Sequence, residues 1–311
     1  MEKRYIIGID QSTQGTKALL FDEEGHLLRR TDLPHRQIVN EKGWVSHDLN
    51  EIYRNTVQTV KTLVAESGVA PETIAGIGIS NQRETTAIWD KATGEPLEEA
   101  IVWQCGRASG IAQEIAEQGH AEEIREATGL QLSAYFPAAK MAWLLRNGGE
   151  ERQKRAADGK LCLGTIDSWL VYKLTGDHAF KTDFSNASRT QLFNLKTLAW
   201  DEKICEMFGI PVCALARVCD SDAVYGTTTM EGLFSEPVPI CGVLGDSHAA
   251  LFGQGCLKPG MIKATYGTGS SLMMNIGDKP IQSSHGVVTS LAWGRGGKVD
   301  YVLEGNLNYT G

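Results

Sequence analysis

The chain has 311 residues, of which 42% are hydrophobic and 22% are charged, and its formal net charge is −8. This composition is that of a globular protein long enough for two domains of ordinary size. The acidic balance argues against a general nucleic-acid binder, and no apolar run approaches the roughly 18 residues of a membrane span.

Seven cysteines are scattered along the chain, and none of them forms a Cys-x-x-Cys pair. An odd, scattered set indicates a reducing cytosol rather than a disulfide framework or a zinc site. The first residues enter an apolar strand at once, without the pattern of a signal peptide. We therefore expect a cytoplasmic protein.

The first predicted elements are two strands joined by a polar turn. The run Tyr5–Ile9 ends in Asp10, and the run Ala18–Phe21 follows the turn Gln11–Lys17. A turn rich in hydroxyls with a glycine presents backbone N–H groups that bind phosphate, and the carboxylate can hold the Mg²⁺ of a nucleotide. An ordinary hairpin with an acidic turn explains the same residues, so both interpretations stay open.

The next polar cluster comes directly after a buried strand. A helix is predicted from Leu49 to Gly68, then a strand over Ile74–Ile79, and then the cluster Ser80–Glu84. Ligands of open α/β sheets bind beyond the carboxyl ends of strands. Arg83 and Glu84 are then either a surface ion pair of little energetic value or a donor and acceptor for polyol hydroxyls.

Other residues are interpreted from their surroundings. Trp103 is either plain core or an apolar wall for substrate carbons, and Tyr135 lies in a loop before a predicted amphipathic helix. His47 is expected to be a hydrogen-bonding loop residue rather than a metal ligand, because no other ligand type clusters near it. The segment Asp183–Thr190 is predicted to be a polar loop.

The last third of the chain repeats the pattern of the first. The apolar strand Ile240–Gly245 ends in Asp246, and Met261–Met274 reads as strand, hydroxyl-and-glycine turn and strand. Two such hairpins favour the nucleotide interpretation and suggest two similar α/β lobes with a cleft between them. From the residues alone, Asp246 is either a helix N-cap or a general base.

At this point many separate blocks agree in order and spacing with one known family. The blocks are Asp10-Gln11 with Thr13, Gly43–Val45 with His47-Asp48, Ser80–Thr86, Ala100–Gln104, Tyr135–Leu144, Asn186–Thr190, Gly245–Gln254 and Thr265–Gly269. They resemble the FGGY family of carbohydrate kinases, and most of all its glycerol-phosphorylating members. The resemblance covers nearly the whole chain.

The resemblance implies an α/β, actin-like (ribonuclease-H-like) ATPase fold with two lobes. The polyol-binding lobe would span residues 1–252, and the nucleotide-binding lobe would begin at 253 and be incomplete at 311. The implied reaction is ATP-dependent phosphorylation of a hydroxyl of a polyol or sugar, with ATP and Mg²⁺ as cofactors and a small-molecule acceptor.

Residue roles are carried over position by position from the family. Asp246 would be the catalytic base, and Asp10 would orient Mg²⁺. The polyol pocket would contain Arg83, Glu84, Trp103, Tyr135, Asp246 and Ser247. The nucleotide would contact Thr13, Gln14, Gly15, Lys17, Thr268 and Gly311.

Two pocket positions depart from the family pattern. Ser247 stands where the family has a glutamine, and Ser271 stands where it has a phenylalanine. Two serines should make the pocket larger and more polar, so we expect an acceptor longer than glycerol, a tetritol or a pentulose of the xylulose or ribulose type. His248, next to Ser247, could hydrogen-bond the substrate, but we expect a histidine on the surface of a helix instead.

Two other classes of function compete with the kinase. One is a truncated polyol-binding lobe without turnover, and the other is a structural ATPase of the actin type. The polyol cluster speaks against the latter, which has no need of such a pocket. We also expect a homo-oligomer, a dimer or a tetramer, because exposed apolar residues such as Leu303 and Leu307 would favour self-association.

Overall fold

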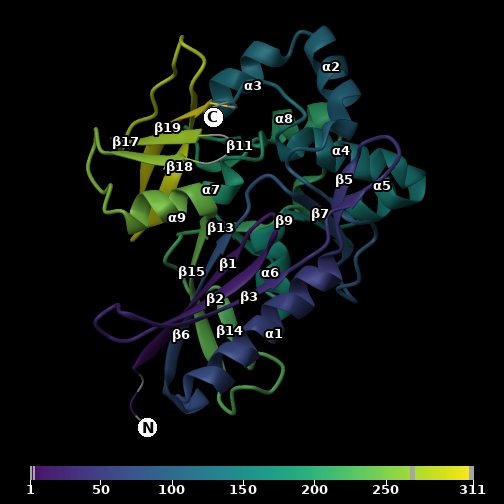
Figure 1. Ribbon diagram of the computed structural model, residues 1–311. Helices are drawn as coiled ribbons and strands as arrows, with labels where there is room; N and C mark the ends of the chain where they lie inside the picture. Colours follow the sequence, from purple (N-terminus) through teal and green to yellow (C-terminus); the bar gives the residue numbers. More distant parts are fainter. Residues whose placement is uncertain (1, 3, 267–269, 308–311) are drawn as a thin grey trace.

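Figure 1 shows the computed structural model, which describes residue 2, residues 4–266 and residues 270–307. Within these residues the strands form sheets of six, five and four strands and two small two-stranded ribbons. The six-stranded sheet lies toward the N-terminal end of the view, and the four-stranded sheet lies beside the C-terminus (Figure 1). The architecture is mixed α/β, as the sequence predicts.

The six-stranded sheet has the order β14-β15-β6-β1-β2-β3. Strands β1, β6 and β15 run parallel at its centre, and β2, β3 and β14 are antiparallel to their neighbours. The bounds are β1 Tyr5–Gln11, β2 Gly15–Phe21, β3 Leu27–Pro34, β6 Ile74–Asn81, β14 Gly226–Thr228 and β15 Val238–Gly245. The expected first hairpin and the strand before Asp246 are therefore confirmed.

Helix α1, Leu49–Ser67, covers one face of this sheet. The side chain of Asp48 caps its first turn by accepting from the backbone N–H of Asn50, and Gly68 ends it with a positive φ of 73°. Its apolar stripe packs on alternate residues of the central strands, which are fully buried. The sheet and this helix form a rigid base from which the carboxyl ends of the strands project.

The five-stranded sheet has the order β4-β5-β8-β7-β9 and carries most of the remaining helices. Its strands are β4 Ile38–Val39, β5 Val45–His47, β7 Thr86–Asp90, β8 Ala100–Ile101 and β9 Leu161–Thr165. The other helices are α2 Ser109–Glu117, α3 Ala121–Thr128, α4 Pro137–Asn147, α5 Gly149–Ala157, α6 Ile166–Leu174, α7 Phe184–Ala187, α8 Glu202–Phe208 and α9 Asp246–Gly253. None of these helices, nor α1, is long and apolar enough to cross a membrane within the described residues.

The four-stranded sheet β16-β17-β19-β18 is built by the end of the chain. Its strands are β16 Ile262–Tyr266, β17 Ser270–Gly277, β18 Val288–Arg295 and β19 Lys298–Leu307, and the two-stranded ribbons are β10 Lys181–Asp183 with β13 Arg217–Cys219 and β11 Phe193–Asn194 with β12 Ala199–Trp200. Helix α9 joins this sheet to β15 and contacts both β16 and β17. The second predicted hairpin is thus present, although its turn lies outside the described residues.

Two expectations about local structure are wrong. The segment Asp183–Thr190 is not a plain loop, because Asp183 caps the short helix α7 by accepting from the backbone N–H groups of Ser185 and Asn186. His47 lies in strand β5 with none of its surface exposed, rather than in a loop. In both cases tertiary packing, which sequence spacing does not show, decides the outcome.

The expected apolar surface also differs. Leu303 is half-buried, and the side chain of Leu307 lies outside the described residues. The exposed apolar side chains of the four-stranded sheet are instead Ile262, Tyr266 and Leu272. Oligomerisation remains a prediction that the structure does not test.

Candidate functional site

The candidate site lies where the three parallel strands of the six-stranded sheet end. Asp10 on β1 pairs in register with Ser80 on β6, and Gly245 on β15 pairs with Asn81. Asp10 and Asp246 therefore leave the sheet on either side of β6, about 10 Å apart at twice the usual spacing between strands. The sequence-predicted carboxylates thus share one edge, as is typical of ligand sites in open α/β sheets.

Asp10 is held by two neighbours in the sheet. Lys17 Nζ lies 2.8 Å from its Oδ2 across the β1–β2 hairpin, and the Ser80 hydroxyl donates to Oδ1 at 3.2 Å. The side chain is 30% exposed, so lone pairs of both oxygens remain open to solvent. This is a fixed carboxylate with an adjacent cation.

The turn of this hairpin contains residues that are expected to contact phosphate, and one of them is hydrogen-bonded to Trp103. Thr13 accepts a hydrogen bond from Trp103 Nε1 at 2.9 Å, while Gln14 is exposed. Gly15 is buried, and a Cβ at this position would lie 2.5 Å from the Leu33 carbonyl oxygen on β3. Close packing of the neighbouring strand is therefore sufficient to require glycine here.

Asp246 is the first residue of α9, and Gly245 rather than Asp246 is the N-cap. Gly245 donates its N–H to the Ser185 hydroxyl at 2.9 Å, which links it to the capped helix α7. A Cβ on Gly245 would lie 2.7 Å from two carbons of the Arg83 side chain. The glycine is needed because Arg83 passes directly over it.

The Asp246 carboxylate faces Arg83. Arg83 Nε lies 3.3 Å from Asp246 Oδ1, which also accepts from the backbone N–H of Ser247 at 2.6 Å. Burial raises the pKa of Asp246 above its ordinary value, Arg83 opposes that rise, and Glu84 and Asp10 add to it. Because the side chain is 44% exposed, water screens part of each effect.

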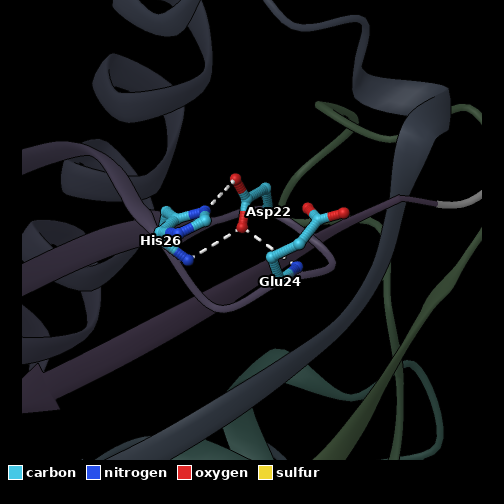
Figure 2. A group of neighbouring side chains, drawn as sticks. All are labelled: Asp22, Glu24 and His26. Atoms are coloured by element: carbon cyan, nitrogen blue, oxygen red, sulfur yellow. Dashed lines mark hydrogen bonds and ion pairs between the residues drawn. The ribbon is translucent and has the colours of Figure 1, made fainter.

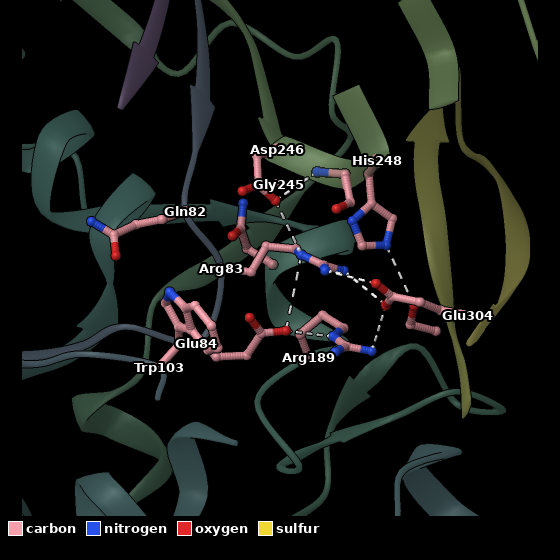
Figure 3. A network of polar contacts seen from close by, with 12 residues as sticks. Gln82, Arg83, Glu84, Trp103, Arg189, Gly245, Asp246, His248 and Glu304 are labelled. Atoms are coloured by element: carbon pink, nitrogen blue, oxygen red, sulfur yellow. Dashed lines mark hydrogen bonds and ion pairs between the residues drawn. The ribbon is translucent and has the colours of Figure 1, made fainter. Parts of the chain in front are cut away.

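Arg83 and Glu84 belong to a buried network of four charges, shown in Figure 3. Arg83 donates from both Nη atoms to the two oxygens of Glu304, at 2.9 and 2.8 Å. Arg189 Nε donates to Glu84 Oε1 at 2.6 Å, and its Nη1 lies 2.9 Å from Glu304 Oε2. All four side chains are less than one-tenth exposed, so the surface ion pair, one of the two interpretations of Arg83 and Glu84, is wrong.

Trp103 and Tyr135 form an aromatic corner beside this network. Their rings meet edge to face at 5.7 Å, and both residues line a cavity of about 380 Å³. Neither is fully buried, so Trp103 is not plain core. An apolar wall next to charged donors and acceptors matches the two sides of a polyol, its carbon chain and its hydroxyls.

Lys140, on α4, holds the backbone of this corner from behind. Its Nζ donates to the carbonyl oxygen of Tyr135 and, at 3.4 Å, to that of Glu84. The side chain is fully buried. Burial lowers the pKa of Lys140 to about 7, although Glu84 opposes the shift.

The structure corrects the expectation for His248. It is fully buried, with Nε2 3.3 Å from the Ser290 hydroxyl, rather than exposed on a helix. Burial lowers its pKa well below the ordinary value, and the nearby Arg83 lowers it further. The predicted nucleotide contacts Thr268 and Gly311 lie outside the described residues.

Sequence reasoning gave no role to Arg189, Glu304, Lys140 or His248. The position of Glu304 in the sequence did indicate a buried ion pair. An acidic residue directly after the apolar run Tyr301–Leu303 needs a partner if it is buried with that run. The partner itself, more than 200 positions earlier in the chain, could not be read from spacing.

A second group of possible metal ligands, Asp22, Glu24 and His26, lies in the turn between β2 and β3 (Figure 2). The Asp22 carboxylate accepts from the backbone N–H groups of Glu24 at 3.1 Å and His26 at 2.8 Å. Its second oxygen contacts His26 Nδ1 at 3.1 Å. These bonds close the turn, so the cluster is explained by the hairpin.

The comparisons with known proteins agree with this geometry. Residues 5–253 match the N-terminal domain of the FGGY family of carbohydrate kinases. The chain is 47% identical over 308 residues to glycerol kinase 2 of Thermotoga maritima and 45% identical over 311 residues to glycerol kinase of Oceanobacillus iheyensis. These alignments cover 99% and 100% of the chain but 62% of each relative, so the chain spans less than two thirds of their length.

Solved structures show the same relationship. The crystal structure of Plasmodium falciparum glycerol kinase with ADP matches with a TM-score of 0.90 at 35% identity, covering 98% of this chain and 62% of that one. Gluconate kinase from Lactobacillus acidophilus matches at 0.84 with 23% identity, over 98% of this chain and 60% of that one, which shows the fold alone. The fold is the actin-like α/β ATPase fold, as the resemblance implied. Because the family match covers well over half of its length, the chain belongs to the FGGY family of carbohydrate kinases.

Proposed function

We propose that the protein transfers the terminal phosphoryl group of ATP to a hydroxyl of a polyol or sugar, with Asp246 as the general base. The observation that carries this proposal is the shared edge at which Asp246, Arg83 and Asp10 meet. The comparisons also support the proposal, because the two relatives with 47% and 45% identity are named as glycerol kinases.

The chemistry requires a proton acceptor and fixed charges. An alcohol becomes a better nucleophile when a carboxylate within hydrogen-bond reach takes its proton as the new O–P bond forms and the bond to the leaving ADP breaks. Burial and the neighbouring Glu84 make Asp246 a better proton acceptor than an ordinary aspartate, because they raise its pKa. The Ser247 N–H and Arg83 hold one of its oxygens, which leaves the other free for the hydroxyl.

The residues around Asp10 fit Mg²⁺ and phosphate. Mg²⁺ with a nucleotide is usually held by one or two carboxylates, several waters and the phosphates themselves, and it would neutralise charge on the transferred group. Asp10 offers one partly exposed carboxylate, and Lys17 beside it offers a positive charge for a phosphate oxygen. Thr13, Gln14 and Gly15 would contact phosphate from the turn, and Thr268 and Gly311 would contact the nucleotide from the second lobe.

The acceptor would bind in a pocket next to Asp246. Arg83, Glu84, Trp103, Tyr135 and Ser247 would line its pocket. Ser271 donates to Glu304 Oε1 at 3.2 Å, so this serine lies beside the Arg83 network. Two small hydroxyl side chains at positions 247 and 271 support an acceptor longer than glycerol, a tetritol or a pentulose.

Release of ADP in the presence of an acceptor tests the proposal. We expect release with ATP, Mg²⁺ and a polyol, and a rate lower by about 10²–10⁴-fold in the Asp246→Asn variant, which should still bind the polyol in calorimetry. Binding without ADP release by the unchanged chain would favour the polyol-binding module instead. A panel of glycerol, erythritol, xylulose and ribulose tests the acceptor, and a clear preference for glycerol would contradict the longer one.

Further proposals concern organisation and location. We place the lobe boundary between residues 252 and 253, which is supported by the end of α9 at Gly253 before β16 begins. A homo-oligomer, a dimer or a tetramer, is supported by the exposed Ile262, Tyr266 and Leu272. A cytoplasmic location is supported by the cysteines, all seven of which are free thiols.

A further inference from the structure

Glu304 is an acidic residue buried in the middle of strand β19. It is 1% exposed, and its register partners on the neighbouring strands are Met273 and Val288. A carboxylate in such surroundings is costly unless it is fully paired. Its two oxygens meet two arginines that come from elsewhere in the chain, Arg83 after β6 and Arg189 after α7.

The contacts divide the donors of Arg83 into two groups. Both Nη atoms are taken by Glu304 in a bidentate pair, which fixes the plane of the guanidinium. Nε remains, and it lies 3.3 Å from Asp246 and 4.0 Å from Glu84. Arg83 therefore approaches Asp246 with a single N–H edge.

The charges explain why this orientation matters. Arg83 and Arg189 balance Glu84 and Glu304, so the four buried groups have no net charge. The charged groups that act on Asp246 are Arg83, Glu84 and Asp10, and Lys263 on β16 also interacts with it. Without Glu304, the guanidinium group of Arg83 would be free to turn, and its two Nη atoms could face Asp246.

We propose that Glu304 is a positioning residue that acts through Arg83: by occupying both Nη atoms, it prevents Arg83 from forming a bidentate pair with Asp246 and so keeps a carboxylate oxygen available for the acceptor hydroxyl. The inference rests on the proposed function of Asp246 as the base. It gives strand β19 of the four-stranded sheet a role at the base, while Arg83 and Asp246 themselves come from the ends of β6 and β15.

The test compares Glu304→Gln with Glu304→Asp and with the unchanged chain. Glutamine removes the charge, whereas aspartate keeps it but is too short for the same bidentate grip. The Asp246 carboxyl is followed by carbon NMR with ¹³C-labelled aspartate, and its signal is assigned from its loss in Asp246→Asn. Polyol affinity from calorimetry and the kcat and KM for ADP release complete the measurements.

We expect the titration midpoint of Asp246 to move to lower pH in both variants, with the larger shift in Glu304→Gln. We also expect kcat to fall about tenfold to a hundredfold in Glu304→Gln, less than the roughly 10²–10⁴-fold that a general base contributes, because Asp246 itself is retained. Polyol affinity should change less than about threefold. Glu114→Gln is the matched control, because Glu114 pairs with Arg146 on the surface at 2.6 Å and should alter none of these readouts.

Two results would overturn the proposal. One is an unchanged Asp246 midpoint in a folded Glu304→Asp chain, which is informative even if Glu304→Gln does not fold. The other is a rise in KM with kcat unchanged, which would assign Glu304 to acceptor binding alone. If the unchanged chain shows no ADP release, the proposed function fails, but the NMR titration still decides whether Glu304 controls the contact between Arg83 and Asp246.

Discussion

The surroundings of Asp10 and Asp246 differ, although both carboxylates leave the same edge of one sheet, at the ends of the two parallel strands that flank β6. Asp10 is paired with Lys17 across a hairpin that the local sequence specifies, and with Ser80 on the adjacent strand β6. Asp246 stands among like charges and one arginine whose orientation is set by a distant strand. Local pairing favours a fixed anion that can orient a cation, whereas the second environment favours a carboxylate that accepts a proton.

The comparison of the two aspartates is tested most strongly at position 246, where removing the carboxylate is expected to have the largest effect on the rate of ADP release. In Asp246→Asn we expect ADP release to fall about 10²–10⁴-fold, because the amide cannot take the hydroxyl proton. Polyol affinity should stay within a few-fold, since the asparagine oxygen still accepts hydrogen bonds. Steady-state kinetics and calorimetry on the same preparation test both statements, and equal losses in binding and turnover would contradict the division of roles.

The matching change at Asp10 should be smaller and of a different kind. In Asp10→Asn we expect the Mg²⁺ concentration for half-maximal activity to rise about tenfold to a hundredfold, because a carboxylate ligand of the cation is lost. Excess Mg²⁺ should restore part of the rate. Ser80→Ala is the control, because it removes only the 3.2 Å hydrogen bond to the same carboxylate. A loss of rate that Mg²⁺ does not relieve would remove the distinction between the two aspartates.

Lys140 holds the backbone of Glu84, a residue whose charge acts on Asp246, and its own environment can be tested through stability rather than activity. Its pKa is lowered to about 7 in the folded chain from an ordinary value of 10.5, chiefly by burial. The unfolded chain therefore binds more protons between these values, and the free energy of unfolding should gain up to about 1.4 kcal/mol per pH unit as the pH rises through this window.

Urea denaturation at pH values from 7 to 10 measures this slope. In Lys140→Met the contribution should disappear, so the difference from the unchanged chain should vary with pH. Lys203→Met is the control, because Lys203 is 67% exposed and pairs with Glu123 on the surface. Parallel stability curves for Lys140→Met and the unchanged chain would show that the buried lysine does not titrate in this range.

The smallest effect is expected at Trp103, which donates a hydrogen bond to Thr13 in the hairpin that contains Asp10. Trp103→Phe keeps an aromatic wall but removes the hydrogen bond to Thr13, and one such bond is worth about 1 kcal/mol, or about fivefold in affinity. We expect polyol binding to weaken by that factor in calorimetry. Trp143→Phe, in a tryptophan that packs edge to face on Trp44, should leave it unchanged. A loss well above tenfold would mean that the indole contacts the acceptor through more than its ring face.

The sequence predicts the Asp10 side better than the Asp246 side, for physical reasons. The β1–β2 hairpin is local, so the alternation of apolar residues and the polar turn identify its two strands. Helix α1 is similarly evident from its spacing and its terminal Gly68. The pairing of Lys17 with Asp10 is not predicted, because the sequence pattern assigns Lys17 to the turn, whereas it lies in β2. Around Asp246, position within the fold decides, since Arg189 and Glu304 reach Glu84 and Arg83 across 105 and 221 positions of the chain.

Burial was the property that sequence patterns described least well. His47 and His248 look like surface histidines by their polar neighbours, yet both are fully buried. The short helix α7 depends on the Asp183 carboxylate, which accepts hydrogen bonds from Ser185 and Asn186 of the helix itself and from the distant Ser221 hydroxyl at 2.7 Å. Such environments arise from packing between sheets, and a pattern of neighbours along the chain does not contain them.

The backbone of Glu84 has φ = 59°, a left-handed conformation that costs a non-glycine residue about 1–2 kcal/mol. A change to glycine would relieve that strain but would leave the buried Arg189 without its carboxylate at 2.6 Å, a loss of about 3–5 kcal/mol. The net balance disfavours the change even in a chain under no demand for catalysis. Selection for thermal stability alone would therefore preserve this glutamate. Its conservation among related sequences would not by itself prove a role in catalysis.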